Sequence, residues 1–286
     1  MRVTFSICAF DLATNELGIA VQSKFLAVGA VVPWARAGVG AIATQSWANT
    51  SYGPDGLRLL AEGLDPDAVA VRLTAEDADR EKRQFGIVDA RGRVATYTGK
   101  ECFEWAGGVK GQGYCAQGNI LAGPKVVEGI AGGFEAATGP LADRLVAALH
   151  GGQRYGGDRR GMQSAALLVV KERGGYGGFN DRYIDLNVDD HARPIDELER
   201  LLALYKLYFK IGPQRALPLD QPTTRELQRI LLRAGRYDGE ATGRYDDATR
   251  GALRELFGIE NLEERWTDEP AIDEAALGFL RTRFRE

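Results

Sequence analysis

A serine and a lysine stand side by side at Ser23 and Lys24, at the end of an alternating apolar stretch. Such a pair can act as nucleophile and base if the lysine is desolvated enough to lose its proton. Adjacent residues of a strand face opposite sides, so a bend would be needed to bring the two side chains together. The alternative is a solvated polar turn, and the sequence leaves both interpretations open.

The loop from Arg154 to Arg160 is a second concentration of functional groups, with three arginines, Asp158 and several glycines. A guanidinium group binds a carboxylate through two parallel hydrogen bonds. Arg160 is therefore a candidate for binding the carboxylate of a peptide-like or amino-acid substrate. Arg83, which precedes a predicted strand, is a candidate for lining the same cleft. The alternative for the loop is a flexible, solvated segment.

The chain has two histidines, and His191 follows two aspartates, Asp189 and Asp190. A carboxylate beside an imidazole can orient a base or hold a metal ion. The same residues precede Pro194, where they could instead satisfy the free N–H groups of a helix's first turn. His191 is therefore a candidate substrate-binding residue. No third zinc ligand is evident, so we predict no metal site and no cofactor, with carboxylate-bound magnesium or calcium as the open alternative.

The elements that must position these groups follow the order strands, two helices, strands, two helices, strands and a closing helix. Period-two alternation and turn residues predict strands at 3–9, 17–22, 28–33, 39–44, 85–89, 93–98, 165–170 and 183–188. Helical spacing and prolines predict two helices between Pro54 and Glu81, then helices at 124–137, at 140–150 and from Pro194. This order indicates an α+β domain and leaves the arrangement of its layers open.

Composition limits the possible partners. The net charge is -4, without a basic block interleaved with aromatics, which disfavours a nucleic-acid partner. No apolar run is long enough for a signal peptide or for spanning a membrane, so we expect a cytoplasmic protein with no membrane partner. Three cysteines without a CxxC spacing argue against a disulfide framework. Extended strands and a long apolar helix favour a homo-oligomer.

Four strings carry a resemblance to a known family. They are TFSICAFD (Thr4–Asp11), GIAVQSKFLAVGAVVP (Gly18–Pro33), GVGAIATQ (Gly38–Gln45) and GGDRRGMQSAALLVV (Gly156–Val170). Together they resemble an uncharacterised bacterial family, domain of unknown function 1028, which is grouped with the N-terminal-nucleophile (Ntn) hydrolases. The resemblance implies a four-layer αββα sandwich over residues 1–212.

The resemblance also implies a reaction. In Ntn hydrolases of the proteasome type, an N-terminal threonine attacks an amide, and its own free amine accepts the proton directly or through water. Thr4 would take that role once residues 1–3 are removed, on a small peptide-like or amino-acid-derived substrate. Gln22 stands where the family has an aspartate, which weakens the match. The catalytic residues implied are Thr4, Ser23, Lys24 and Asp158, and Gln45 and Ser164 join Arg83, Arg160 and His191 as substrate-binding candidates.

The C-terminal segment has a different character. A linker is predicted at 213–221, followed by a small all-α domain at 222–286 with two amphipathic helices around a glycine-rich turn. Strings such as GRYDG (235–239) and TGRY (242–245) resemble the peptidoglycan-binding repeat. This resemblance implies binding of cell-wall fragments, with docking or dimerisation as the alternative. A non-catalytic binding or assembly protein is therefore the rival to a hydrolase.

Overall fold

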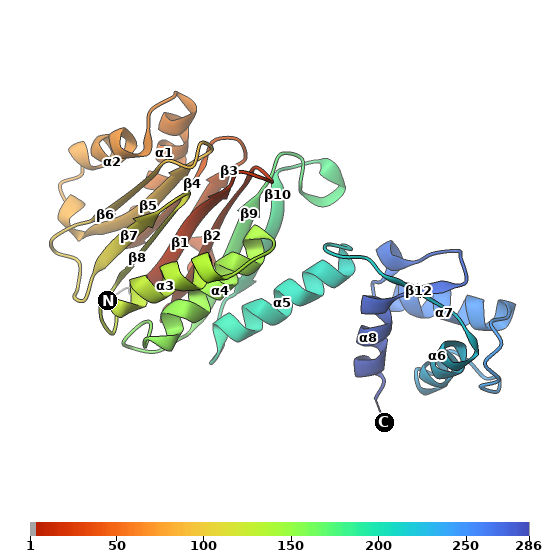
Figure 1. Ribbon diagram of the computed structural model, residues 1–286. Helices are drawn as coiled ribbons and strands as arrows, with labels where there is room; N and C mark the ends of the chain where they lie inside the picture. The colour runs from red at the N-terminus through yellow and green to blue at the C-terminus, as the bar shows by residue number, and fades with distance from the viewer. Residues whose placement is uncertain (1–3, 286) are drawn as a thin grey trace. The chain divides into compact units, whose positions relative to one another are not determined.

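The computed structural model describes residues 4–285 (Figure 1). The chain divides into two compact units, and the boundary lies between Arg200 and Leu201, within helix α5 (Pro194–Tyr208). The boundary predicted from the sequence lies further along the chain, after residue 212. The segment predicted as a linker, 213–221, contains a short strand, β11 (Ala216–Pro218). Among the described residues, no helix is both long and apolar enough to cross a membrane.

Two antiparallel sheets form the centre of the first unit. The larger has the strand order β10-β9-β2-β1-β8-β7, with bounds β1 (Thr4–Asp11), β2 (Glu16–Ser23), β7 (Gly107–Gly111), β8 (Tyr114–Asn119), β9 (Ser164–Val170) and β10 (Arg182–Val188). The smaller has the order β3-β4-β5-β6, with bounds β3 (Pro33–Arg36), β4 (Gly40–Ser46), β5 (Arg83–Asp89) and β6 (Val94–Thr98). The two sheets contact each other through pairs such as β1 with β4 and β5 with β8.

Each sheet carries two helices on its other side (Figure 1). Helices α1 (Tyr52–Ala61) and α2 (Pro66–Ala75) contact the smaller sheet, and α3 (Lys125–Ala136) and α4 (Leu141–Arg154) contact the larger one. Local sequence explains where α2 begins, because the Asp65 side chain accepts a hydrogen bond from Ala68 N at 2.8 Å and proline occupies the first helical position. The predicted mixture of helices and strands is confirmed.

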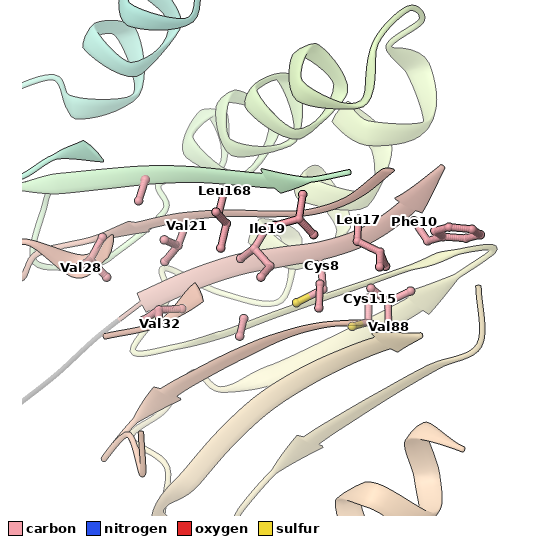
Figure 2. Close-up of a cluster of buried hydrophobic side chains, with 14 residues drawn as sticks. Cys8, Phe10, Leu17, Ile19, Val21, Val28, Val32, Val88, Cys115 and Leu168 are labelled. Carbon is pink, nitrogen blue, oxygen red and sulfur yellow. The ribbon is translucent and has the colours of Figure 1, made fainter. Parts of the chain in front are cut away.

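The space between the two sheets is filled from both sides by alternate residues of each strand. Figure 2 shows its apolar part, where Cys8, Ile19 and Val21 of the larger sheet pack with Val88 of the smaller one. On β1 this inward face continues through Ser6 to Thr4, so one strand contributes to both an apolar and a polar region. All residues of β1 from Thr4 to Phe10 are buried.

Three local predictions were wrong. The segment 28–33 is not a strand: Val28–Ala30 is a 3-10 turn, preceded by Ala27 at a φ of 52°, a left-handed conformation that interrupts an extended chain. The glycine-rich passage at 107–123, for which no element was predicted, contains β7 and β8, because tertiary pairing overrides the low strand propensity of glycine. Helix α4 extends to Arg154, into the segment predicted as a loop.

The second unit is helical, as predicted, around its own hydrophobic core. Its helices are α6 (Gln221–Arg233), α7 (Asp247–Ile259) and α8 (Glu274–Arg283), and the first and second correspond to the two amphipathic helices expected. Helix α8 and a two-stranded sheet of β11 and β12 (Ala271–Asp273) were not predicted. The buried Arg265 donates to Asp273 Oδ1 at 2.8 Å, so the charge that it brings into the core is paired.

Candidate functional site

Thr4 and Ser23 lie next to each other where β1 begins and β2 ends. The antiparallel register that pairs Phe5 with Gln22 brings both side chains to the inward face of the larger sheet. The Thr4 hydroxyl donates to Ser23 Oγ at 3.2 Å. Thr4 is 4% exposed and Ser23 is fully buried. The structure therefore brings together two of the hydroxyl groups that the sequence singled out, and residues 1–3, whose removal would free the Thr4 amine, lie outside the described residues.

Asp158 approaches the same strand end from the loop after α4. Its buried carboxylate accepts hydrogen bonds from the backbone N–H of Lys24 at 2.8 Å and of Arg160 at 2.9 Å. The Arg160 guanidinium also donates to it at 3.2 Å, in a salt bridge. Asp158 thus holds the chain directly after Ser23, and Arg160 is engaged with Asp158.

Lys24 takes part through its backbone, and its side chain points elsewhere. The ammonium group is exposed and donates to the Met162 carbonyl at 3.3 Å. The Ser23 hydroxyl meets Thr4 on the buried side of the strand end. The two side chains have different partners, so the bend that a Ser23–Lys24 nucleophile–base pair requires is absent.

Ser164 positions the turn that follows β2. It lies opposite Ser23 in the pairing of β2 with β9. Its hydroxyl accepts a hydrogen bond from Val28 N at 3.1 Å and donates to the Phe25 carbonyl. Ser164 is therefore a support for the 25–28 turn beside the site, because both of these bonds go to the backbone of that turn.

Gln45 connects the smaller sheet to the polar end of β1. Its Oε1 accepts a hydrogen bond from the Ser6 hydroxyl at 2.6 Å, and its Nε2 donates to Gln84 Oε1 at 2.9 Å. The same Nε2 donates to the Thr4 carbonyl at 3.3 Å. Gln45 thus hydrogen-bonds both to the backbone of Thr4, the candidate nucleophile, and to the side chain of Ser6, which lies on the same face of β1.

Further amides complete this cluster. Gln117 Nε2 donates to the Ser6 hydroxyl at 2.7 Å, and Asn119 Nδ2 donates to Gln84 Oε1 at 2.8 Å. Sequence reasoning missed Ser6, Gln117 and Asn119. The signal was present, since polar residues at alternate positions of YCAQGN share one face of a strand, but no strand had been predicted there. The inter-sheet polar cluster is defined here as Thr4, Ser6, Gln45, Gln84, Gln117 and Asn119.

Arg83 lies outside this cluster, on the opposite face of β5 from Gln84. Its guanidinium donates to Asp77 Oδ2 at 2.8 Å and to the Trp47 carbonyl at 2.6 Å. The hydrogen bonds from Arg83 hold the pKa of the Asp77 carboxyl below its usual range. Burial and the hydrogen bond to Asp77 raise the pKa of the Tyr52 hydroxyl. The structure gives Arg83 a carboxylate partner from its own chain and does not bring it to Thr4.

His191 is close to the site through its backbone only. Its N–H donates to the Gln163 carbonyl at 2.7 Å, and Gln163 N donates to the Ser23 carbonyl at 3.0 Å. The exposed ring accepts a hydrogen bond at Nδ1 from Arg193 N at 3.1 Å, one residue before helix α5 begins. Across residues 4–285, no group of three or more His, Cys, Asp or Glu side chains is placed to hold a metal ion.

The site brings together functional groups of several kinds. It combines a threonine hydroxyl, a second hydroxyl in contact with it, a carboxylate held by backbone N–H groups and a set of neutral amides. Within residues 4–285, neither a histidine ring nor a lysine ammonium hydrogen-bonds to the Thr4 hydroxyl. The Thr4 hydroxyl is bonded instead to the Ser23 hydroxyl.

Comparison with known proteins places this site in a family. The model described as "Family of unknown function (DUF1028)" matches residues 4–198, and the model described as "Putative peptidoglycan binding domain" matches residues 208–280. The crystal structure of protein SPO2555 from Silicibacter pomeroyi, described as a DUF1028 protein, is 30% identical with a TM-score of 0.66. That match covers 71% of this chain and 86% of the SPO2555 chain. No curated protein matches the sequence. The chain belongs to the DUF1028 family and carries a C-terminal peptidoglycan-binding-like domain.

Proposed function

We propose that the first unit has the four-layer αββα architecture of the Ntn hydrolases. Two facing sheets, each with a helix pair on its other side, support this proposal. In that architecture the nucleophile lies at the start of an inner strand, between the sheets. Thr4 has this place on β1, which lies between β2 and β8 within the larger sheet.

The proposed activity is hydrolysis of an amide bond in a small peptide-like or amino-acid-derived substrate. The Thr4 hydroxyl attacks the carbonyl carbon, and the free amine of the same residue accepts the hydroxyl proton. The tetrahedral intermediate collapses, the C–N bond breaks, and the protonated Thr4 amine gives its proton to the leaving amine. Water then hydrolyses the ester between the acyl group and Thr4, which releases a carboxylic acid and restores the Thr4 hydroxyl. The observation that carries this proposal is the hydrogen bond between the Thr4 and Ser23 hydroxyls, 3.2 Å long, beside an aspartate that holds the following backbone.

The surrounding residues have positioning roles in this mechanism. Ser23 orients the Thr4 hydroxyl, and Gln45 holds the Thr4 carbonyl. Asp158 fixes the strand end by accepting from Lys24 N. Preorganised groups of this kind lower the barrier because they need no rearrangement during the reaction. The mechanism requires that residues 1–3 be removed, which exposes the Thr4 amine.

Intact mass before and after exposure to an electrophilic β-lactone tests the proposal. The expected result is a chain that begins at Thr4 and gains one lactone adduct, mapped to that residue. Thr4→Ala removes the hydroxyl and should abolish the adduct. Lys24→Gln is the matched control, because the Lys24 side chain is exposed and should leave labelling unchanged. A full-length chain that never reacts at Thr4 would rule the mechanism out.

A second candidate function is a non-catalytic binding or assembly protein. It is favoured by the low exposure of Thr4, 4%, and by the placement of the Lys24 ammonium away from the Thr4 hydroxyl. In this proposal the C-terminal domain binds cell-wall fragments or a protein partner. If the chain is cytoplasmic, as the sequence predicts, the ligand is a released fragment rather than the intact wall. Self-association into a homo-oligomer stays a prediction.

Sedimentation with purified peptidoglycan, using the full chain and a chain ending after Arg200, tests the second candidate. The full chain should appear in the pellet and the truncated one in the supernatant. Equal sedimentation of both would contradict binding of cell-wall material by the C-terminal domain. The lactone experiment is independent of this outcome, since the two functions concern different parts of the chain.

A further inference from the structure

Cys8 and Cys115 form an adjacent pair of thiols inside the first unit. They are direct partners in the antiparallel pairing of β1 with β8. Both side chains belong to the same apolar cluster between the sheets, and both are fully buried. Figure 2 shows the two sulfur atoms within this cluster, on neighbouring strands. Sequence spacing could not reveal the pair, because 106 residues separate the two positions and β8 was not predicted.

The pattern of backbone hydrogen bonds between β1 and β8 indicates how far apart the Cα atoms of Cys8 and Cys115 lie. Phe10 N donates to the Gly113 carbonyl at 2.8 Å, which makes these two residues a hydrogen-bonded pair. Pair types alternate along an antiparallel ladder, so Cys8 and Cys115, two positions further along each strand, form a hydrogen-bonded pair as well. Such pairs have Cα atoms about 5.5 Å apart, inside the range that a disulfide spans.

Both thiols are chemically quiet in the folded chain. Each lies near a carbonyl of β5, with Cys8 Sγ 3.6 Å from Gly86 O and Cys115 Sγ 3.5 Å from Ile87 O. Burial and the neighbouring thiol raise the pKa of Cys8. Thiolate is the reactive form, so exchange requires that the strands be at least transiently open, as they are during folding.

We propose that Cys8 and Cys115 are a disulfide-forming pair, and that the structure shows its reduced state. The oxidant is a small-molecule disulfide such as glutathione disulfide. One protein thiolate attacks a sulfur of the oxidant, which forms a mixed disulfide and releases one glutathione thiolate. The second protein thiolate attacks the protein sulfur of the mixed disulfide and releases the second glutathione. The protein loses two hydrogen atoms, and the oxidant gains them as two thiols.

The disulfide would cross-link the strand that carries Thr4 to the strand that carries Gln117. Thr4, Ser6 and Cys8 share one face of β1, and Cys115 shares one face of β8 with Gln117. The bond would therefore lie two residues further along each strand than the contact between Ser6 and Gln117. It would close a long loop and so stabilise the first unit by restricting the unfolded chain.

The test is refolding of the full chain in buffer containing glutathione disulfide, against refolding with a reductant. The expected product has lost the mass of two hydrogens, gives a peptide linking Cys8 to Cys115, and melts several degrees higher than the reduced protein. Cys102→Ser is the matched control and should form the same bond, because Cys102 is buried away from the pair beside the Arg83 carbonyl.

Cys115→Ser should prevent the mass loss, and Cys8→Ser should do the same if the first variant folds poorly. Alkylation of both Cys8 and Cys115 in correctly refolded, oxidant-treated protein would overturn the proposal. A bond from either of them to Cys102 would overturn it equally. A disulfide that forms during refolding but not on treatment of the native protein would support the proposal, because the buried thiols are accessible to the oxidant only while the strands are open.

Discussion

The space between the two sheets has a polar end and an apolar end, and a single strand supplies both. On β1, Thr4 and Ser6 join the inter-sheet polar cluster, whereas Cys8 and Phe10 belong to the apolar cluster in Figure 2. Facing residues follow the same division. Gln45 of β4 meets the polar part, while Ala41 and Ala43 of that strand pack in the apolar part.

The two ends contribute differently to stability. Burial of apolar surface stabilises the fold roughly in proportion to area, at about 25 cal/mol per Å². A buried amide gains little over its hydration by water, and it costs about 1–3 kcal/mol when a partner is missing. Because two oxygens of the polar cluster, Gln117 Oε1 and Asn119 Oδ1, have no partner among the described residues, this end is stabilised less than the other. The comparison indicates that the apolar end contributes more to the stability of the fold than the polar end does.

The largest loss in the free energy of unfolding should follow from a cavity at the apolar end. Ile19 is fully buried on β2 at the centre of the larger sheet, and Ile19→Ala removes side-chain volume that the rigid sheets cannot refill. We expect a loss of about 3–4 kcal/mol in the free energy of unfolding, measured by urea denaturation. Reactivity at Thr4 should persist in the folded fraction. A loss below about 1 kcal/mol would show that this end does not carry the fold.

A smaller effect should follow from Gln45→Leu at the polar end. The change removes the acceptor for the Ser6 hydroxyl and the donor to the Thr4 carbonyl, and leaves both buried. We expect a loss of about 2–3 kcal/mol. Lactone labelling of Thr4 should fall as well, because the Thr4 backbone is no longer held. Unchanged labelling would show that the inter-sheet polar cluster is not needed for the reactivity of Thr4.

Gln22 provides the matched control for Gln45. It is also fully buried, but it lies on the opposite face of β2 from Ser23. Among residues 4–285, neither its Nε2 nor its Oε1 has a hydrogen-bond partner. Replacement of an unpaired buried amide by an apolar group of similar shape relieves a desolvation cost. Gln22→Met should therefore be neutral or stabilising by about 1 kcal/mol. If both variants lost stability equally, burial of any glutamine, rather than the polar cluster, would be the cause.

The fold was largely predictable from the sequence where local signals agree with tertiary ones. Alternation over residues 3–9 predicts β1, observed at Thr4–Asp11, and the cap at Asp65 followed by Pro66 predicts α2. The prediction failed at 107–119, where glycines conceal a hairpin that is stabilised by pairing with β1. Such a strand forms because of its neighbours, and its own residues give little indication of it.

The site was less predictable, for a related reason. The sequence could single out Thr4, Ser23 and Asp158. In the structure Thr4 contacts Ser23, and Asp158 accepts from the N–H of the residue after Ser23. It could not show that Arg83 turns to the other face of its strand, where Asp77 is its partner. Side-chain direction depends on register, and a shift of one residue reverses it. The amides of Gln117 and Asn119 lie on β8, opposite the polar end of β1. Because β8 was not predicted, these two residues were missed as well.

The smallest loss of stability should come from charge, because the inter-sheet polar cluster is built from neutral side chains and the charged pair lies outside it. Arg83 lowers the pKa of the Asp77 carboxyl, so this carboxyl stays ionised in the folded chain at pH values where the unfolded chain takes up a proton. Its contribution to stability is therefore present above about pH 4 and is lost as the pH falls below that value.

Asp77→Asn should cost about 1–2 kcal/mol near neutral pH, with a difference from the wild type that shrinks towards about pH 3. Asp55→Asn, at an exposed carboxyl of α1, should stay within about 0.5 kcal/mol at both pH values. A difference for Asp77→Asn that grew on acidification would mean that the Arg83–Asp77 pair does not stabilise the folded chain.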